Sequence, residues 1–439
     1  MTTWWCEHAW LDDAPVAGVR VGQESGVITS VETGVAAEPD DERLTGLVLA
    51  GFANAHSHAF HRAMRGRTHD EGGTFWTWRE RMYQVAGRLD PDSYLALARA
   101  TYAEMALAGV TCVGEFHYLH HGPGGTPYDD PNAMSQALRQ AAAEAGIRIT
   151  VLDACYLAGG LTPEGHTRPD AVQQRFSDGS VSRWAARVGD LRPDDGLRVG
   201  AAIHSVRAVP KIELGEVASA FPNAPLHAHL SEQSDENLSA FAFYGLSPSE
   251  LMAGADALGS RSTMVHATVA PHMELLGSTG TNVCICPTTE RDLADGIGPA
   301  RLMADHGSPL CLGSDQNAVI DLLEEARAME MHERLFTLER GVFAPSELVS
   351  ALTHQGHAAL GWPEAGRIQV GAVADLVAVR LDSPRTAGVA AAQAVYAATA
   401  SDVVTVVQAG RVVVRDGEHV LGDVGRLLTE AIEPLWENA

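Results

Sequence analysis

The chain has 439 residues, of which 46% are hydrophobic and 20% are charged, and these proportions are typical of a globular protein rather than a disordered or fibrous one. Its net charge of -25 argues against nucleic acid and against an anionic membrane as partners. The first residues lack the basic and apolar segments of a secretory signal, so we expect a cytoplasmic protein whose scattered cysteines are reduced.

Both ends of the chain are rich in predicted strands. Residues 15–50 alternate apolar and polar positions between turn glycines, and a similar pattern returns in "GRIQVGAVADLVAVRL" and "VVTVVQAGRVVVRDGEHV". We expect the two ends to pair into one small β-sandwich domain. Residues 1–48 then form its N-terminal part, and residues 366–439 form its C-terminal part with a terminal helix.

The region between these ends, residues 49–365, has a different pattern. Eight short runs rich in Val, Ile, Leu and Cys alternate with helical segments, which indicates parallel strands that crossover helices bury on both faces. The clearest helices are "PDSYLALARATYAEMALAG" and "DPNAMSQALRQAAAEAG". The pattern predicts an α/β fold, a (β/α)8 TIM barrel. The predicted strands are "LVLAGFANAHSH", "TCVGEFHYL", "IRITVLDACYL", "LRVGAAIHSV", "PLHAHLSE", "STMVHATVA", "TNVCICPTT" and "PLCLGSDQ".

Polar side chains stand at the C-terminal ends of these strands, where barrel enzymes carry their chemistry. In chain order they are His56 and His58, Glu115, His117 and Tyr118, His204 and Arg207, His227, His229 and Glu232, His266, and Asp315. A lone histidine in an apolar strand is usually a core residue, but agreement among several strand ends favours a shared site. Because alternate strand residues point the same way, His56 and His58 can both face the barrel axis.

A catalytic zinc ion prefers imidazole and carboxylate ligands and keeps one position open for water. The strand ends offer such a set in His56, His58, His229 and Asp315. Zinc would lower the pKa of bound water towards about 7 and so provide a hydroxide nucleophile at neutral pH. Asp315 can also accept the proton of that water.

Two further residues have both a catalytic and a structural interpretation. Glu232 can carry the proton to a leaving nitrogen, or it can simply cap the helix that follows. His266 can polarise the reacting centre, or it can serve only in packing. The sequence pattern leaves both alternatives open.

The motifs "HSH", "HAHLSE", "VHAT" and "GSD", together with "GRIQVGAVADLV", resemble the amidohydrolase superfamily across nearly the whole chain. Many superfamily members with two metals bridge them through a carbamylated lysine at strand 4. The only lysine here is Lys211, which lies beyond that strand. The resemblance therefore implies one divalent metal ion, zinc.

Within the superfamily, "HSHAFHRAMRGRTH", "GGTFWTWRERMY", "GVTCVGEFHYLHH" and "IHSVRAV" resemble the N-formimino-L-glutamate deiminases of histidine degradation. The resemblance implies hydrolysis of N-formimino-L-glutamate to N-formyl-L-glutamate and ammonia. Matched by motif, the family's metal ligands fall on His56, His58, His229 and Asp315, its catalytic pair on Glu232 and His266, and its substrate contacts on Arg79, Tyr118, His204 and Arg207. The family pattern has glutamine after "HAF", whereas this chain has His61, which we keep as a candidate substrate contact.

The arginines support a dianionic small-molecule substrate independently of the resemblance. An acidic protein repels such a molecule unless local arginines, whose planar forks match carboxylates, bind it. Arg207 and either Arg79 or Arg81 are placed to do so, although each could instead form a surface salt bridge. A homodimer is one assembly that the sequence allows.

Two alternative functions stay open. The first is a nucleobase or aminopyrimidine deaminase with the same metal centre, which would need aromatic and amide groups over a flat ring. The second is a metal-free barrel that serves as a scaffold, with the histidines in packing roles. The completeness of the ligand set argues against the scaffold.

Overall fold

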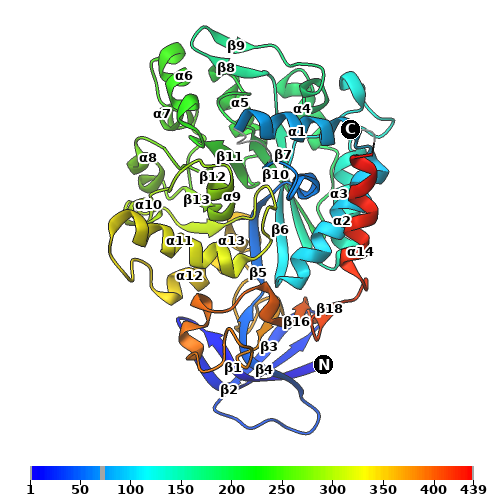
Figure 1. Ribbon diagram of the computed structural model, residues 1–439, viewed down its shortest axis with the longest axis vertical. Coiled ribbons are helices and arrows are strands. Elements are labelled where there is room, and N and C mark those ends of the chain that lie inside the picture. Colours follow the sequence, from blue (N-terminus) through cyan, green and yellow to red (C-terminus); the bar gives the residue numbers. More distant parts are fainter. Residues whose placement is uncertain (1, 70–74, 438–439) are drawn as a thin grey trace.

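A closed parallel β-barrel forms the body of the molecule (Figure 1). The computed structural model describes residues 2–69 and 75–437. A parallel bridge between Ser57 and Asp315 joins the last barrel strand to the first and closes the ring. The predicted (β/α)8 barrel is therefore confirmed. Its strands are β5 (Phe52–Ser57), β6 (Val110–His117), β7 (Arg148–Cys155), β10 (Leu197–Ile203), β11 (Leu226–Leu230), β12 (Ser262–His266), β13 (Asn282–Ile285) and β14 (Leu310–Leu312).

Helices surround the barrel, and their ends follow the sequence signals. Asp90 caps α2 (Pro91–Leu107), because its side chain accepts a hydrogen bond of 2.9 Å from the Ser93 N–H. α3 (Ala133–Ala145) ends at Gly146, which has the left-handed φ of 75° that glycine adopts without strain. The other α-helices of the described chain are α1 (Phe75–Arg88), α4 (Val181–Val188), α5 (Lys211–Ala220), α6 (Ser234–Tyr244), α7 (Pro248–Gly254), α8 (Met273–Ser278), α9 (Pro287–Asp292), α10 (Ala300–Asp305), α11 (Leu322–Thr337), α12 (Pro345–Leu352), α13 (His354–Ala359) and α14 (Val424–Ile432).

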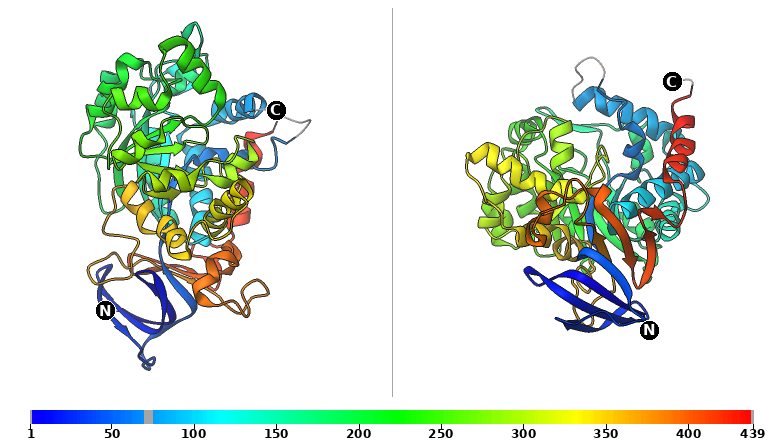
Figure 2. Two further views of the ribbon diagram at one scale, coloured as in Figure 1. Left: turned by 90° about the vertical axis from the view of Figure 1, so that its left-hand side faces the viewer. Right: turned by 60° about the horizontal axis from the view of Figure 1, so that its bottom comes forward.

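The two ends of the chain meet in a second β-sheet below the barrel, as predicted (Figure 2). Its strands run in the order β18-β17-β16-β15-β4-β1-β2-β3, so N-terminal and C-terminal strands pair through β4 and β15. Trp4 and Ile28 belong to a core of this sheet that is separate from the barrel core. The strands are β1 (Thr2–Leu11), β2 (Ala14–Glu24), β3 (Val27–Thr33), β4 (Glu42–Ala50), β15 (Leu376–Val379), β16 (Val403–Gln408), β17 (Arg411–Arg415) and β18 (Glu418–His419).

One predicted strand is divided in the structure. The run "LVLAGFANAHSH" is predicted to be the first barrel strand, but its first half ends β4 and only its second half is β5. Gly51 separates them, and a Cβ atom there would lie 2.7 Å from the Asp375 Cβ and would also overlap Thr111. The close approach of three segments at this point therefore requires glycine and ends the strand.

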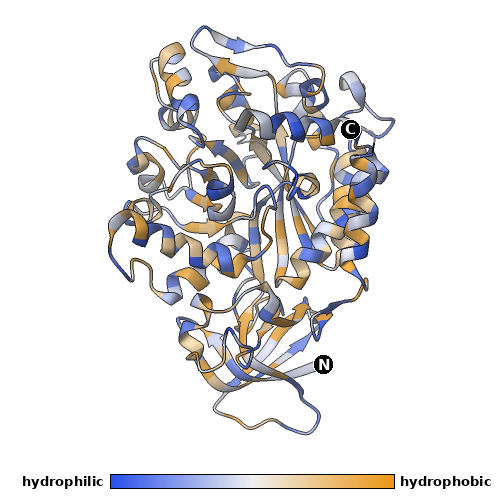
Figure 3. Cartoon of the chain, viewed as in Figure 1, coloured by the Kyte–Doolittle hydropathy of each residue, from blue (hydrophilic) through white to orange (hydrophobic). Residues whose placement is uncertain are grey.

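The apolar residues concentrate in the strands and on the inner sides of the helices, as Figure 3 shows by its orange colouring. The terminal helix α14 leaves the second sheet and packs against α2, where Leu428 joins the barrel core. All six cysteines lie in the described chain as buried free thiols. Over that same part of the chain, we find no helix with the length and apolar character needed to cross a membrane.

Candidate metal centre and active site

A cavity of about 310 Å³ lies at the C-terminal ends of the barrel strands. Most polar groups of its wall come from residues at or just beyond these ends, and Arg79 comes from α1. The predicted site residues in the wall are His58, His61, Arg79, Tyr118, His204, Arg207, His229, Glu232, His266 and Asp315. His56, fully buried, lies directly behind Asp315. The structure thus brings together the residues that the family motifs match. The strand-end residues Glu115, His117 and His227 do not line this cavity, and neither does Arg81.

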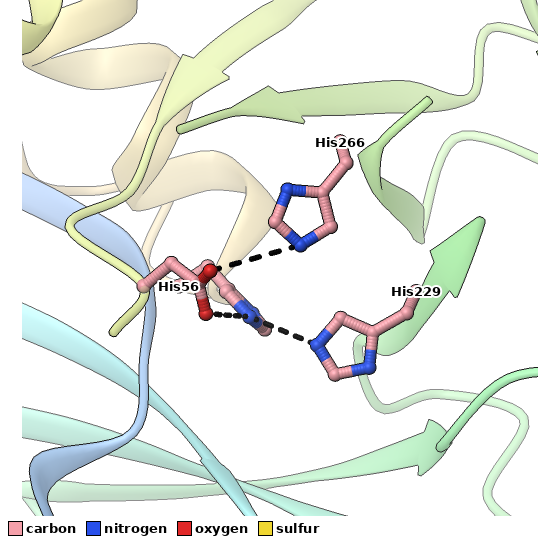
Figure 4. Close-up of side chains that lie close together, drawn as sticks. His56, His229 and His266 are labelled. Atoms are coloured by element: carbon pink, nitrogen blue, oxygen red, sulfur yellow. Dashed lines mark hydrogen bonds and ion pairs between the residues drawn. The ribbon is translucent and has the colours of Figure 1, made fainter. Parts of the chain in front are cut away.

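Nitrogen and oxygen donors converge at the floor of this cavity. Donor atoms of His56, His229, His266 and Asp315 all lie within 4.8 Å of one another. Asp315 Oδ1 lies 3.2 Å from His56 Nε2 and 3.3 Å from His58 Nε2. Figure 4 shows the imidazoles of His56, His229 and His266 pointing toward a common centre. A set of this composition fits a single zinc-type ion.

The hydrogen bonds of two histidines show which nitrogen faces the centre. His58 Nδ1 lies 2.9 Å from the Phe116 carbonyl oxygen, and His229 Nδ1 lies 2.9 Å from that of His204. A carbonyl oxygen only accepts, so each imidazole carries its hydrogen on Nδ1 and presents a lone pair from Nε2. The lone pair of His58 faces the Asp315 carboxylate. The lone pair of His229 faces Nε2 of His56, 3.2 Å away. Such an arrangement is stabilised by a cation, and carbonyl-bound Nδ1 atoms are the usual support of metal-binding histidines.

Burial controls the protonation of this centre. It disfavours the charged imidazole and lowers the pKa of His56 to about 3, despite the neighbouring carboxylate. Burial would also favour a protonated Asp315, but its close contacts with the imidazoles of His56 and His58 outweigh this and hold the pKa of the carboxyl well below its usual range. His56 is therefore a neutral imidazole and Asp315 an ionised carboxylate, the forms in which these side chains bind a metal.

His266 differs from the other histidines of the centre. Burial opposes its charge, yet the contact with Glu290 and the nearby carboxylates of Glu232 and Asp315 raise its pKa to about 10. Its Nδ1 lies 3.5 Å from Glu290 Oε1, and its Nε2 lies 3.8 Å from Asp315 Oδ2. A protonated imidazole in this position can donate a hydrogen bond to a substrate at the centre.

Glu232 stands beside the centre and opposite Arg207. Its Oε1 is 3.9 Å from His266 Nε2, and its Oε2 accepts a 3.0 Å hydrogen bond from Arg207 Nη2. The backbone around it is unusual, because Ser231, His266 and Asp315 all have positive φ values, of 47°, 68° and 41°. Non-glycine residues in this region are strained, and such strain gathers at functional sites.

Aromatic and cationic side chains line the outer part of the cavity. His61 Nε2 lies 2.9 Å from the Tyr118 hydroxyl, and the Arg79 guanidinium lies 5.5 Å from the centre of the Tyr83 ring. Arg79 and Arg207 line the same cavity. The site therefore combines metal-type donors with two guanidinium groups.

Some residues of the site were not predicted. Glu236, Glu290, Asp295 and Tyr156 lie in or next to it. Burial, followed by the charge of Glu232, raises the pKa of Asp295 to about 8. Glu236 follows "HAHLSE" in a segment that sequence patterns assign to a solvated helix, and Asp295 lies in the loop after α9. Neither position carries a local signal that distinguishes it from a surface acid.

A second group of metal-type side chains lies away from this cavity. It contains His117, His120 and Asp153, all of them buried. Both oxygens of Asp153 already accept hydrogen bonds from Arg187, at 2.8 Å and 2.9 Å. The guanidinium supplies the positive charge that a metal would supply, so this group is a buried ion pair.

Comparison with known proteins agrees with the fold. The model of the amidohydrolase family matches residues 47–413. The chain is 34% identical to formimidoylglutamate deiminase of Pseudomonas aeruginosa, over 95% of this chain and 96% of that protein. It is 28% identical to 5-methylthioadenosine/S-adenosylhomocysteine deaminase of Natronomonas pharaonis, over 94% and 92% of the two chains.

Two solved structures are similar to the whole chain. An amidohydrolase from Brucella melitensis superposes with a TM-score of 0.92 at 34% identity, covering 99% of this chain and 100% of that one. An adenosine deaminase from Xanthomonas campestris with bound zinc superposes with a TM-score of 0.84 at 22% identity, covering 98% and 96%. The second likeness shows the shared fold.

Proposed function

The chain belongs to the amidohydrolase family and is a hydrolase that acts on C–N bonds, and from this premise we propose that it hydrolyses N-formimino-L-glutamate to N-formyl-L-glutamate and ammonia. In this proposal the reaction is a step of histidine degradation. The similarity to a formimidoylglutamate deiminase over nearly the whole of both chains supports this choice of substrate.

The observation that carries the proposal is the presence of two arginines in the cavity that contains the metal-type donors. A molecule with two carboxylates and a formimino group needs a site for each. The guanidinium groups of Arg79 and Arg207 match carboxylates in shape and charge. The donors at the floor lie deeper in the same cavity, where the formimino group would be placed.

We propose that His56, His58, His229 and Asp315 hold one zinc ion, since their lone pairs and carboxylate oxygen converge. Zinc bound by these residues supplies Lewis acidity, which makes water a usable nucleophile at neutral pH. Lys211 begins α5 on the surface, outside the cavity wall, so it does not bridge a second metal.

The protein's own residues would move the protons. The water oxygen adds to the formimino carbon while the Glu232 carboxylate takes a proton from that water. Glu232 then gives this proton to the terminal nitrogen, which becomes an amino group. As the C–N bond breaks and the carbonyl forms, the proton of the added hydroxyl passes to the same nitrogen through Glu232, and the nitrogen leaves as ammonia. His266, protonated beside Glu290, donates a hydrogen bond that orients the reacting group. His61, Tyr118 and His204 form the wall against the rest of the substrate.

A nucleobase or nucleoside deaminase is the second candidate. Relatives at 28% identity deaminate 5-methylthioadenosine or S-adenosylhomocysteine, as their names state, and the cavity wall includes Tyr118, Tyr156 and Phe176. Aromatic rings of this kind can stack on a base. A neutral base, however, has no anionic group for Arg79 and Arg207 to bind. The two arginines therefore favour the dianionic substrate.

Ammonia release from the zinc-loaded protein tests the proposal. N-formimino-L-glutamate should release one equivalent of ammonia and leave N-formyl-L-glutamate, which mass spectrometry identifies. Adenine, cytosine, guanine and 5-methylthioadenosine should release little. Ammonia from one of the bases alone would replace the proposed substrate with a nucleobase, and no release from any compound would refute a deiminase.

A further inference from the structure

Glu236 is a carboxylate that the proposed mechanism does not use, yet it is deeply buried beside the reacting centre. It lies in the first turn of α6, and its side chain is 0% exposed. Buried carboxylates of this kind are rare unless they are paired. The groups that contact Glu236 therefore indicate its role.

One oxygen of Glu236 contacts the residue before Glu232, and the other contacts Arg207. Oε1 accepts a 3.1 Å hydrogen bond from the N–H of Ser231, the residue directly before Glu232. Oε2 lies 3.2 Å from Nε of Arg207, whose Nη2 donates to Glu232. The Arg207 guanidinium is thus held between two carboxylates.

A helix-capping role does not account for these contacts. Glu236 is the third residue of the helix. In a capping box an acid at this position accepts a hydrogen bond from the N–H of the N-cap residue, which here is Gln233. Glu236 instead reaches back to Ser231, which has a positive φ of 47° and is also held through its hydroxyl by Asn237 at 2.7 Å. The acid therefore supports the strained turn that carries Glu232.

We infer that Glu236 is a positioning residue for the Glu232–Arg207 pair. Its hydrogen bond with Ser231 fixes the turn that presents Glu232. Its contact with Nε of Arg207 balances the charge of the guanidinium group. Without that balance the guanidinium would be drawn to Glu232 alone, and both the proton carrier and the carboxylate site would be weakened. The inference rests on the proposed function, in which Glu232 moves a proton and Arg207 binds a substrate carboxylate.

Glu236→Gln separates charge from shape. The amide has the same length and can still accept the Ser231 hydrogen bond, but it has no charge to balance Arg207. We expect kcat/KM for N-formimino-L-glutamate to fall by about 10- to 100-fold, with a higher KM and a lower kcat. Zinc content and the thermal midpoint should stay close to those of the wild type. Asp235→Asn is the matched control, because it removes one charge from the same helical turn at an exposed position and should change kcat/KM by less than about twofold.

A double-mutant cycle shows whether Glu236 acts through Arg207. In an Arg207→Lys background, Glu236→Gln should cost less than about threefold, because the contact it supports is already lost. Equal losses in both backgrounds, or near-normal activity of Glu236→Gln alone, would overturn the inference. Should the amide prevent folding, Glu236→Asp enters the same cycle, because a shorter carboxylate keeps the charge but cannot span Ser231 and Arg207.

The proposed function can fail separately from this inference. If the wild type releases no ammonia from N-formimino-L-glutamate, the substrate is wrong. The same cycle is then measured with whichever compound does release ammonia, and additive losses there would still contradict a positioning role.

Discussion

Buried histidines that contact a backbone carbonyl do so through either of the two ring nitrogens. His58 and His229 bind a carbonyl through Nδ1 and present Nε2 to the centre. His227 and His357 instead bind a carbonyl through Nε2, at 3.0 Å and 3.1 Å. The motif "HAH" in β11 contains one of each kind, so the repeat alone could not say which histidine faces the centre.

Replacing His229 by alanine should remove the metal and the activity, because one of the converging nitrogens is lost. Elemental analysis of the dialysed wild type should give one zinc per chain, and that of His229→Ala should give almost none. His227→Gln is the control, since its side chain lies away from the cavity and should leave zinc in place. Two metals per active chain, or full zinc in His229→Ala, would disprove the single site.

Glu232→Gln should keep zinc and fold but lose most turnover, because an amide cannot carry a proton. General acid-base groups typically contribute about 10²- to 10⁴-fold in rate, so kcat should fall within that range. The measurement is steady-state ammonia release with zinc content determined on the same sample. Turnover close to the wild type would leave Glu232 with only its hydrogen bond to Arg207.

Glu115 gives the stability of the fold a pH dependence. It is fully buried on β6, accepts a 2.7 Å hydrogen bond from the Ala59 N–H, and has a pKa raised to about 8, mainly by burial. The unfolded carboxyl has a pKa of about 4.3, so between these values the folded state holds a proton that the unfolded state releases. Stability contributed by this group therefore falls as pH rises from about 4 to about 8.

Glu115→Gln should remove that dependence, since the amide accepts the same hydrogen bond without ionising. The thermal midpoint of Glu115→Gln minus that of the wild type should increase from pH 5 to pH 8. A difference that is constant across this range would mean that Glu115 is not protonated in the folded protein.

At the scale of the elements, the sequence predicted helices better than the places where strands end. Pro91 at the start of α2 and Gly146 at the end of α3 are signals that the local sequence carries. The break at Gly51 depends on Thr111 and Asp375, which come from distant parts of the chain. The hairpin of β8 (Gly160–Thr162) and β9 (Gly165–Thr167), which lines the cavity, was also not expected, because its strands are too short for a period of two to show.

Gly51→Ala tests the strand junction. The new methyl group would lie 2.7 Å from the Asp375 Cβ, so the backbone of two sheets must shift. Overpacking of this kind typically costs about 1–3 kcal/mol of unfolding free energy, which denaturant titration measures. Gly87→Ala is the control, because a Cβ atom there meets nothing within 4 Å in helix α1 and alanine favours helix. Equal stability of the two variants would mean that the junction has room for a side chain.

At the scale of the whole molecule, the arrangement of strands explains how much of the site could be predicted. Strand ends of a closed barrel meet at one mouth, so the amino-acid sequence alone is enough to place residues as far apart as His56 and Asp315 together. Glu236, Glu290 and Asp295 lie beyond the strands, where helix packing and loop paths decide which side chains turn inward. No periodic pattern encodes those paths.

Because the molecule is strongly acidic, the two arginines in its cavity bear on the charge of the substrate. A chain of net charge -25 repels a dianion, so a dianionic substrate depends on the local field of Arg79 and Arg207. We propose that this cavity selects a formimino compound with two carboxylates and removes its terminal nitrogen.

The most direct test is kcat/KM of the zinc-loaded wild type for N-formimino-L-glutamate and for N-formimino-L-glutamine, which has the same shape but lacks the side-chain carboxylate. Loss of a charge-assisted hydrogen bond costs about 1.5–3 kcal/mol, so we expect a preference of roughly 10- to 100-fold for the dianion. Equal kcat/KM for the two compounds, or deamination of a nucleobase with neither of them hydrolysed, would contradict the proposed function.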